Sequence, residues 1–295
     1  MFKGRWWGLG VTLAGLFVAF GGVLAELARF CWGQDLYSYI PLIPVVSGYV
    51  VWVRRRGLND GLLPRPWLAA PPAVLGAAIL AAHARAAAAG WLPLESDSLA
   101  VMVVSLLFFA TAACCLFLSP AALRKIAFPL GFLVFAVPMP GAFRDGLERL
   151  LQDWSAVVAD GFFSASFTTY WRDGLVFHLL GITIQVAPEC SGIRSTLVLF
   201  ILSILAAHLY LQGFWRRAAF IAFVLPLAIV RNGFRIWVIG ELCIHVGPEM
   251  INSYIHRRGG PIFFALSLVP FYWFLQRLRR GENLPAYPQT LPKTT

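Results

Sequence analysis

Long apolar runs, separated by short polar clusters, follow one another along most of the chain. Several have the roughly 20 apolar residues that an α-helix needs to cross the hydrocarbon core of a bilayer. We predict eight membrane-spanning helices, which cover approximately residues 7–30, 39–53, 67–89, 98–118, 126–143, 191–211, 218–239 and 261–275. The third run is the weakest because His83 and Arg85 lie in its second half, so we expect that end to be wet or packed against protein.

The longest polar interruption is residues 144–189, and a loop of this length is uncommon without structure of its own. In its first part, apolar residues recur at helical spacing, which predicts an amphipathic helix at the membrane interface or capping the bundle. The apolar side of this helix comprises Leu147, Leu150, Leu151, Trp154, Val157 and Val158. The last part, residues 174–189, is rich in β-branched residues and broken by Gly181, which predicts a short β-hairpin before Cys190.

Together these patterns predict an all-α polytopic membrane protein in which the chain reaches Cys190 as a strand and leaves it as a helix. Residues 1–280 are expected to form a single integral-membrane domain. The remaining residues, 281–295, are rich in proline, and we expect them to be a disordered cytoplasmic tail.

Basic residues predict how the helices are oriented. They cluster at alternating ends of successive predicted spans, and the positive-inside rule assigns these ends to the cytoplasm. The clusters are Lys3 with Arg5, Arg54 to Arg56 with Arg65, Arg124 with Lys125, Arg216 with Arg217, and Arg277 with Arg279 and Arg280. Both termini are then cytoplasmic, and residues 144–189 and 241–260 lie on the other side of the plasma membrane. Arg257 and Arg258 are exceptions to the rule.

Composition changes this picture little. The chain is 59% hydrophobic and 13% charged, with a mean hydropathy of +0.72, which excludes an ordinary soluble domain. Its net charge of +10 follows from the basic clusters between spans and gives no reason to expect a nucleic-acid partner. The five cysteines show neither a CxxC spacing nor ligand-spaced histidines beside them, so we expect no metal, no disulfide framework and no cofactor.

The stretch "VAPECSGIRST" contains the first candidate for chemistry, Cys190. Because Ser191 and Gly192 can begin a helix, this thiol would sit beside a helix N-terminus, where the dipole and unpaired amides favour a thiolate. Arg194 lies one turn on and could stabilise a thiolate or an oxyanion. Glu189 directly before the cysteine is either a further ionisable group of the site or a solvated loop acid. A small buried apolar role for the cysteine is the alternative.

Two further segments contain polar residues at the predicted outer ends of spans. In "RNGFRI", Arg231 and Arg235 are one turn apart on one helical face, and Asn232 adds a polar group to the same turn. Snorkelling to the interface is the alternative for these arginines. In "INSYIHRRGG", His256 could transfer protons near neutral pH. A thiol, a base and a cation that stabilises an anion are the components of acyl-transfer chemistry.

These segments, "VAPECSGIRS", "RNGFRI" and "HRRGG", resemble in order and spacing the motifs of the exosortase and archaeosortase family of membrane cysteine transpeptidases, in particular the exosortase type. Three other segments, "LYSYIPLIPVVSGYVVW", "FPLGFLVFAVPMP" and "YWRDGLVFHL", extend the resemblance to nearly the whole chain. The family's nucleophile falls on Cys190, its catalytic arginine on Arg235 and its third catalytic position on His256, where some members have arginine. Many members have histidine where this chain has Tyr39, which leaves the subclass open.

The resemblance implies cleavage of a C-terminal sorting signal on exported proteins: a short motif such as Pro-Glu-Pro, a transmembrane helix and a basic cluster. Cys190 would form a thioester that an envelope acceptor resolves, with Arg194, Asn232 and Glu189 in supporting roles. Two other functions stay open. A membrane acyltransferase would carry a lipid acyl group on Cys190, and an anion transporter would line its path with Arg85, Arg231 and Arg235.

Overall fold

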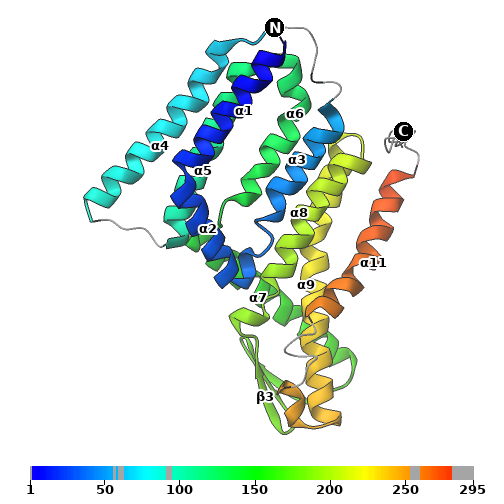
Figure 1. Ribbon diagram of the computed structural model, residues 1–295. Coiled ribbons are helices and arrows are strands. Elements are labelled where there is room, and N and C mark those ends of the chain that lie inside the picture. Colours follow the sequence, from blue (N-terminus) through cyan, green and yellow to red (C-terminus); the bar gives the residue numbers. More distant parts are fainter. Residues whose placement is uncertain (1, 56–57, 59–62, 91–94, 253–259, 281–295) are drawn as a thin grey trace, which may run out of the picture. The chain divides into compact units, whose positions relative to one another are not determined.

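A computed structural model describes residues 2–55, 58, 63–90, 95–252 and 260–280 of the chain (Figure 1). The chain divides into two compact units, Met1–Arg144 and Asp145–Thr295. Among the described residues, six helices are long and apolar enough to cross a membrane, or up to eight spans if each of two bent helix pairs is one span. The predicted all-α polytopic class is therefore confirmed, and the predicted eight spans equal the upper end of this count.

The first unit consists almost entirely of helices. They are α1 (Phe2–Ala19), α2 (Gly21–Gly33), η1 (Asp35–Tyr37), α3 (Leu42–Arg54), η3 (Pro66–Ala69), α4 (Ala70–Ala88), α5 (Glu95–Phe117), α6 (Pro120–Phe132) and η4 (Leu133–Ala136). Ser105 on α5 donates a hydrogen bond to the Gly76 carbonyl of α4 over 2.9 Å. A second contact joins the same helices, since His83 Nε2 lies 2.8 Å from Ser98 Oγ. At the weak end of the third predicted span, His83 thus contacts α5, whereas Arg85 is exposed.

Two predicted spans of this unit are not single straight helices. The run 7–30 bends by 66° between α1 and α2 at Phe20, where two glycines follow and local helix propensity is low. The run 126–143 ends as a helix at Ala136, and α7 (Gly141–Ala165) begins after a bend of 86°. Pro138 and Pro140 lie in this gap, and proline both lacks an amide donor and disfavours the helical conformation of the residue before it. Apolarity alone does not reveal either bend.

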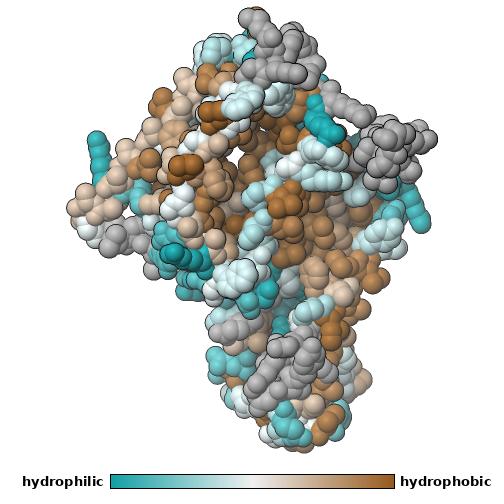
Figure 2. Space-filling view, viewed as in Figure 1, coloured by the Kyte–Doolittle hydropathy of each residue, from teal (hydrophilic) through white to brown (hydrophobic). Residues whose placement is uncertain are grey.

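The described residues of the second unit include most of α7, the helices α8 (Ile193–Tyr210), α9 (Phe214–His245) and α11 (Gly260–Arg279), and the short helices η5 (Pro188–Cys190) and η6 (Pro248–Asn252). Both α8 and α11 pack against α9, and the shared core includes Leu199, Phe220 and Phe271. Figure 2 shows apolar side chains over much of the visible surface where the membrane helices lie, as expected for surfaces that contact lipid.

Helix α9 is longer than a membrane requires. Its 32 residues extend for about 48 Å, compared with a hydrocarbon core of about 30 Å. The predicted span 218–239 therefore underestimates the helix at both ends. We infer that its last turns, which carry polar contacts, project beyond the hydrocarbon core.

The predicted amphipathic helix is α7, and its predicted apolar side is divided between the protein interior and the surface. Leu151 is buried, Leu150, Trp154 and Val157 are exposed, and smaller residues including Ser155 and Ala159 are fully buried. The helix approaches α9 closely at two glycines. A Cβ atom on Gly233 would lie 2.6 Å from Val158 Cγ1, and one on Gly240 would lie 2.5 Å from Phe163 Cζ. Close helix packing of this kind requires small residues at the contact.

Three antiparallel strands follow α7 in the order β1 (Tyr170–Asp173), β2 (Val176–Leu179) and β3 (Ile182–Gln185). The predicted hairpin is β2 with β3, in which Phe177 is opposite Ile184. The strand β1 was not predicted. It pairs with β2 from Tyr170 opposite Leu179 to Asp173 opposite Val176, and the sheet shares its core with Phe163 of α7 and Ile236 of α9.

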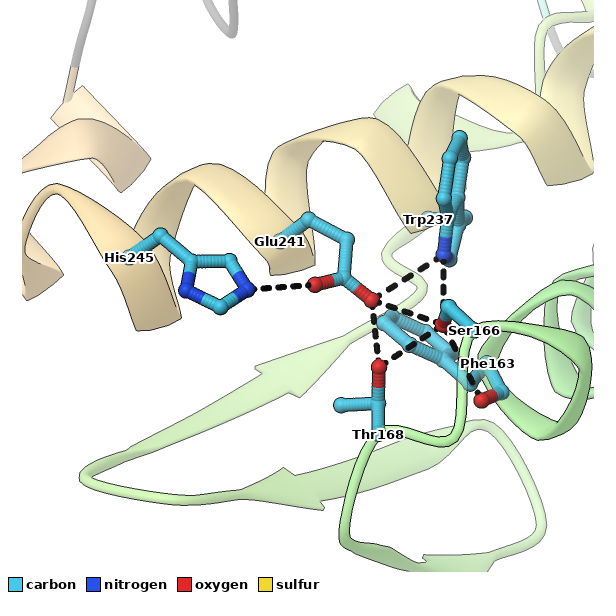
Figure 3. Close-up of polar contacts among 6 residues, drawn as sticks. All are labelled: Phe163, Ser166, Thr168, Trp237, Glu241 and His245. Carbon is cyan, nitrogen blue, oxygen red and sulfur yellow. Dashed lines mark hydrogen bonds and ion pairs between the residues drawn. The ribbon is translucent and has the colours of Figure 1, made fainter.

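A carboxylate near the end of α9 anchors the connection between α7 and β1 (Figure 3). Glu241 Oε1 accepts hydrogen bonds from Ser166 Oγ at 2.8 Å, from Trp237 Nε1 at 3.1 Å and from Thr168 Oγ1, and His245 Nε2 lies 3.2 Å from its second oxygen. Between the two anchored hydroxyls, Phe167 has a φ of 56°, which is unusual for a residue other than glycine. These bonds fix α7, the sheet and α9 to one another.

Candidate active site

Cys190 lies at the end of a tight turn between the sheet and α8. After β3, the Cys190 amide donates to the Ala187 carbonyl over 2.8 Å, and the Ser191 amide donates to the Pro188 carbonyl over 3.0 Å. Helix α8 begins three residues after the cysteine, at Ile193. The prediction that the chain reaches Cys190 from a strand and leaves it as a helix is confirmed, with the short helix η5 between the two.

Gly192 is required in this turn for two reasons. Its φ of +72° lies in the left-handed region, where a side chain is costly. Moreover, a Cβ atom at this position would lie 3.0 Å from Asn232 Oδ1 and 3.2 Å from Arg231 Nη2. The turn can therefore adopt this conformation against α9 only with a glycine.

Two adjacent residues of α9 bond to the backbone of the turn. Asn232 Nδ2 donates to the Cys190 carbonyl over 2.8 Å. Arg231 Nη2 lies 3.4 Å from both the Gly192 carbonyl oxygen and Thr196 Oγ1. Both side chains are buried, with 3% of Asn232 and 7% of Arg231 exposed. The polar turn recognised in "RNGFRI" thus touches the backbone that carries the thiol.

Cys190 and Arg235 line one pocket. Its remaining walls come from the end of β3 and the residues after it and from the next turns of α9: Ile184, Gln185, Val186, Ile236 and Ile239. Both the thiol residue and the arginine are half-buried. Apolar walls strengthen the interaction between charges because they reduce the local dielectric screening. A cation in such a pocket favours a thiolate and stabilises an oxyanion, which is the requirement of nucleophilic acyl transfer.

Three further predicted site residues are Arg194, His256 and Glu189. Arg194 lies in the first turn of α8, where it is exposed, and it is not one of the pocket's lining residues. His256 and the side chain of Glu189 lie outside the described residues. Within the described part of the chain, no three His, Cys, Asp or Glu side chains converge as metal ligands. The expectation of no metal stays a prediction.

One contributor to the site was not predicted from the sequence. Gln152 of α7, 6% exposed, donates from Nε2 to the Val186 carbonyl over 3.0 Å and so holds the segment before Cys190. The sequence offers a weak signal for it, because Gln152 is a polar residue adjacent to the predicted apolar side of an amphipathic helix. Its burial and its bond to Val186 are tertiary features that the pattern within one helix does not contain.

Comparison with known proteins identifies the family. The family model for transmembrane exosortases (Exosortase_EpsH) matches residues 32–273, which include Cys190, both arginines of "RNGFRI" and His256. Neither the curated proteins nor the solved structures include a match. The family match covers well over half of the chain and agrees with its several membrane-length helices. The chain therefore belongs to the transmembrane exosortase family and is an integral, multi-pass membrane protein.

Proposed function

We propose that this protein is a membrane-embedded cysteine peptidase and transpeptidase that cleaves C-terminal sorting signals from exported proteins. The observation that carries the proposal is the pocket lined by both Cys190 and Arg235. A thiol and a fixed cation within one apolar pocket can form and stabilise a tetrahedral acyl intermediate. Membership of the exosortase family supports the same chemistry.

In the proposed reaction, the Cys190 thiolate attacks the carbonyl carbon of the scissile peptide bond. Arg235 stabilises the oxyanion while the tetrahedral intermediate exists. The C–N bond then breaks, His256 donates a proton to the departing amine, and the exported protein remains attached to Cys190 as a thioester. An acceptor nucleophile of the cell envelope, deprotonated by His256, attacks the thioester and releases the thiolate.

The depth of Arg235 in the membrane agrees with a substrate that is itself anchored by a helix. Arg217, near the start of α9, is expected at the cytoplasmic surface by the positive-inside rule. Eighteen residues of helix separate it from Arg235, a rise of about 27 Å, which is close to the thickness of the hydrocarbon core. Arg235 would therefore lie at the extracytoplasmic boundary, where a substrate's transmembrane helix ends and its sorting motif begins.

The proposed partners, which follow from the resemblance to exosortases, are exported proteins with a short motif, one apolar helix and a basic cluster, together with an envelope acceptor. The protein would lie in the plasma membrane, the inner membrane of a cell that has two, with both termini in the cytoplasm. Arg194, Asn232 and Glu189 would support the reaction without taking part in bond formation.

The proposal is tested by expressing the full chain with a reporter that ends in such a sorting signal. The Cys190→Ala variant is expected to leave the full-length reporter in the membrane, whereas the wild type shortens it. Cys243→Ala is the matched control, because Cys243 is a buried thiol of α9 that does not line the pocket. Normal shortening of the reporter by Cys190→Ala would end the proposal.

A further inference from the structure

The backbone around Cys190 is held by two adjacent residues of another helix. Asn232 donates to the carbonyl of Cys190 itself, at 2.8 Å. Arg231 contacts the carbonyl two residues later, at Gly192, and also the hydroxyl of Thr196 in the first turn of α8. The Arg231–Asn232 pair therefore connects α9 to the turn immediately before α8 and to the start of that helix.

A contribution to the stability of the fold does not explain why position 231 is an arginine. Its side chain is 7% exposed, and its Nη1 atom is buried with no hydrogen-bond partner among the described residues. An unsatisfied buried donor costs about 1–3 kcal/mol, and more when the group is charged. An apolar side chain of similar size would avoid that cost. A role in the site explains why an arginine is present here.

The same helix also carries the cation of the pocket. Arg235 follows Arg231 by four residues, so the two lie on one face of α9 about 5–6 Å apart at their Cβ atoms. Within a helix this separation is fixed by the backbone. Helix α9 bonds to the backbone of the turn through residues 231 and 232 and carries Arg235 one turn later. It therefore sets the distance between the thiol and that cation.

We infer that Arg231 and Asn232 are positioning residues, which hold the turn from Cys190 to Gly192 so that the thiol faces Arg235. This inference rests on the proposed function, because it assigns Cys190 as the nucleophile. Neither residue touches the reacting atoms in this role, and both act through the backbone of the turn. Gly192 is part of the same arrangement, since only a residue without Cβ leaves room for the pair.

The test measures how Cys190 reacts with two alkylating reagents of similar size, anionic iodoacetate and neutral iodoacetamide. The full-length protein is reconstituted in nanodiscs, and mass spectrometry of the Cys190 peptide gives each rate. A thiol held beside Arg235 favours the anionic reagent, and Arg235→Ala shows the ratio of rates without that cation. We expect Asn232→Ala to lower the ratio at least about threefold, towards the Arg235→Ala value.

Ser203→Ala is the matched control. It also removes a buried side-chain donor to a backbone carbonyl, since Ser203 Oγ donates to the Phe200 carbonyl over 2.7 Å, but it lies further along α8 and does not line the pocket. This variant is expected to retain the wild-type ratio. A wild-type ratio in Asn232→Ala would overturn the inference, and so would an equal fall in Ser203→Ala, because general loosening of the protein would then explain both.

Two further variants keep the test decisive. Asn232→Leu fills the same space without a donor, so the ratio can still be measured if the alanine variant is unstable, and the same fall is expected. Arg231→Lys retains the charge but has a single terminal nitrogen in place of the guanidinium. A lowered ratio of the iodoacetate rate to the iodoacetamide rate supports positioning by Arg231. An unchanged ratio would show that Arg231 does not position the turn. Because no substrate is needed, these results are separate from the failure or success of the sorting-signal assay.

Discussion

Replacing Gly192 by alanine would disturb the turn that carries Cys190 in two ways. The left-handed conformation, with a φ of +72°, costs about 1–2 kcal/mol for a residue with a Cβ atom. The added methyl group would also lie 3.0 Å from Asn232 Oδ1, so the Asn232 side chain must move. If that breaks its bond to the Cys190 carbonyl, the unsatisfied buried groups add about 1–3 kcal/mol.

The sum, about 2–5 kcal/mol, should lower the apparent melting temperature of the purified protein by roughly 5 °C or more. Processing of the sorting-signal reporter should fall further than stability alone explains, since a misplacement of about 1 Å in a catalytic group can cost about 100-fold in rate. Both quantities are measured on the same preparation, the first by a thermal melt in detergent and the second by the fraction of shortened reporter.

Gly161→Ala is the control for this prediction. Gly161 lies inside α7 with no atom within 4 Å of a Cβ placed on it, so alanine is expected to be neutral or to stabilise the helix by about 0.5–1 kcal/mol. Wild-type melting and wild-type processing in Gly192→Ala would refute the argument that this turn requires glycine.

Three further predictions concern the elements that support the site. Gly240→Leu should separate α9 from Phe163 and destabilise the protein by about 1–3 kcal/mol, measured by thermal melting. Glu241→Gln should weaken charge-assisted bonds to residues 166–168, and faster amide hydrogen exchange in that segment alone is the expected result; unchanged exchange contradicts it. Ser105→Ala should cost about 0.5–1.5 kcal/mol through the lost bond to Gly76, with no effect on the rate of Cys190 alkylation.

Much of the fold follows from the sequence because membrane helices depend on a local property, the length of an apolar run. The runs at residues 98–118 and 191–211 match α5 and α8 closely for this reason. The length of an apolar run does not show where a helix bends. The break at Phe20 and the break at Pro138 and Pro140 depend on a few residues within otherwise apolar segments, and they turn predicted single spans into bent pairs.

The tertiary contacts of single elements were not predicted. The apolar side assigned to α7 includes both Trp154, which is exposed, and Val158, which lies against Gly233 of α9. The strand β1 was missed because "YWRD" is short and half polar, and it is held in place by pairing with β2. Both outcomes are set by tertiary contacts, which the sequence pattern within one segment does not contain.

For the pocket, the sequence predicted Cys190 and Arg235 as candidate site residues but not their arrangement. Cys190 and Arg235 are 45 positions apart, and their meeting in one pocket depends on how α9 packs beside β3 and the turn. The bond from Asn232 to the Cys190 carbonyl has the same origin. The role of His256 stays a prediction, because that residue lies outside the described part of the chain.

The central claim is that Cys190 forms a thioester with the exported protein, and trapping that intermediate tests it most directly. The wild-type protein is purified in detergent, away from the envelope acceptor that would release the acyl group, and is incubated with the sorting-signal reporter before an acid quench. Mass spectrometry of the Cys190 peptide is then expected to show a peptidyl adduct that neutral hydroxylamine removes. A fatty acyl group on Cys190, or shortened reporter accumulating in the Cys190→Ala variant, would contradict the account.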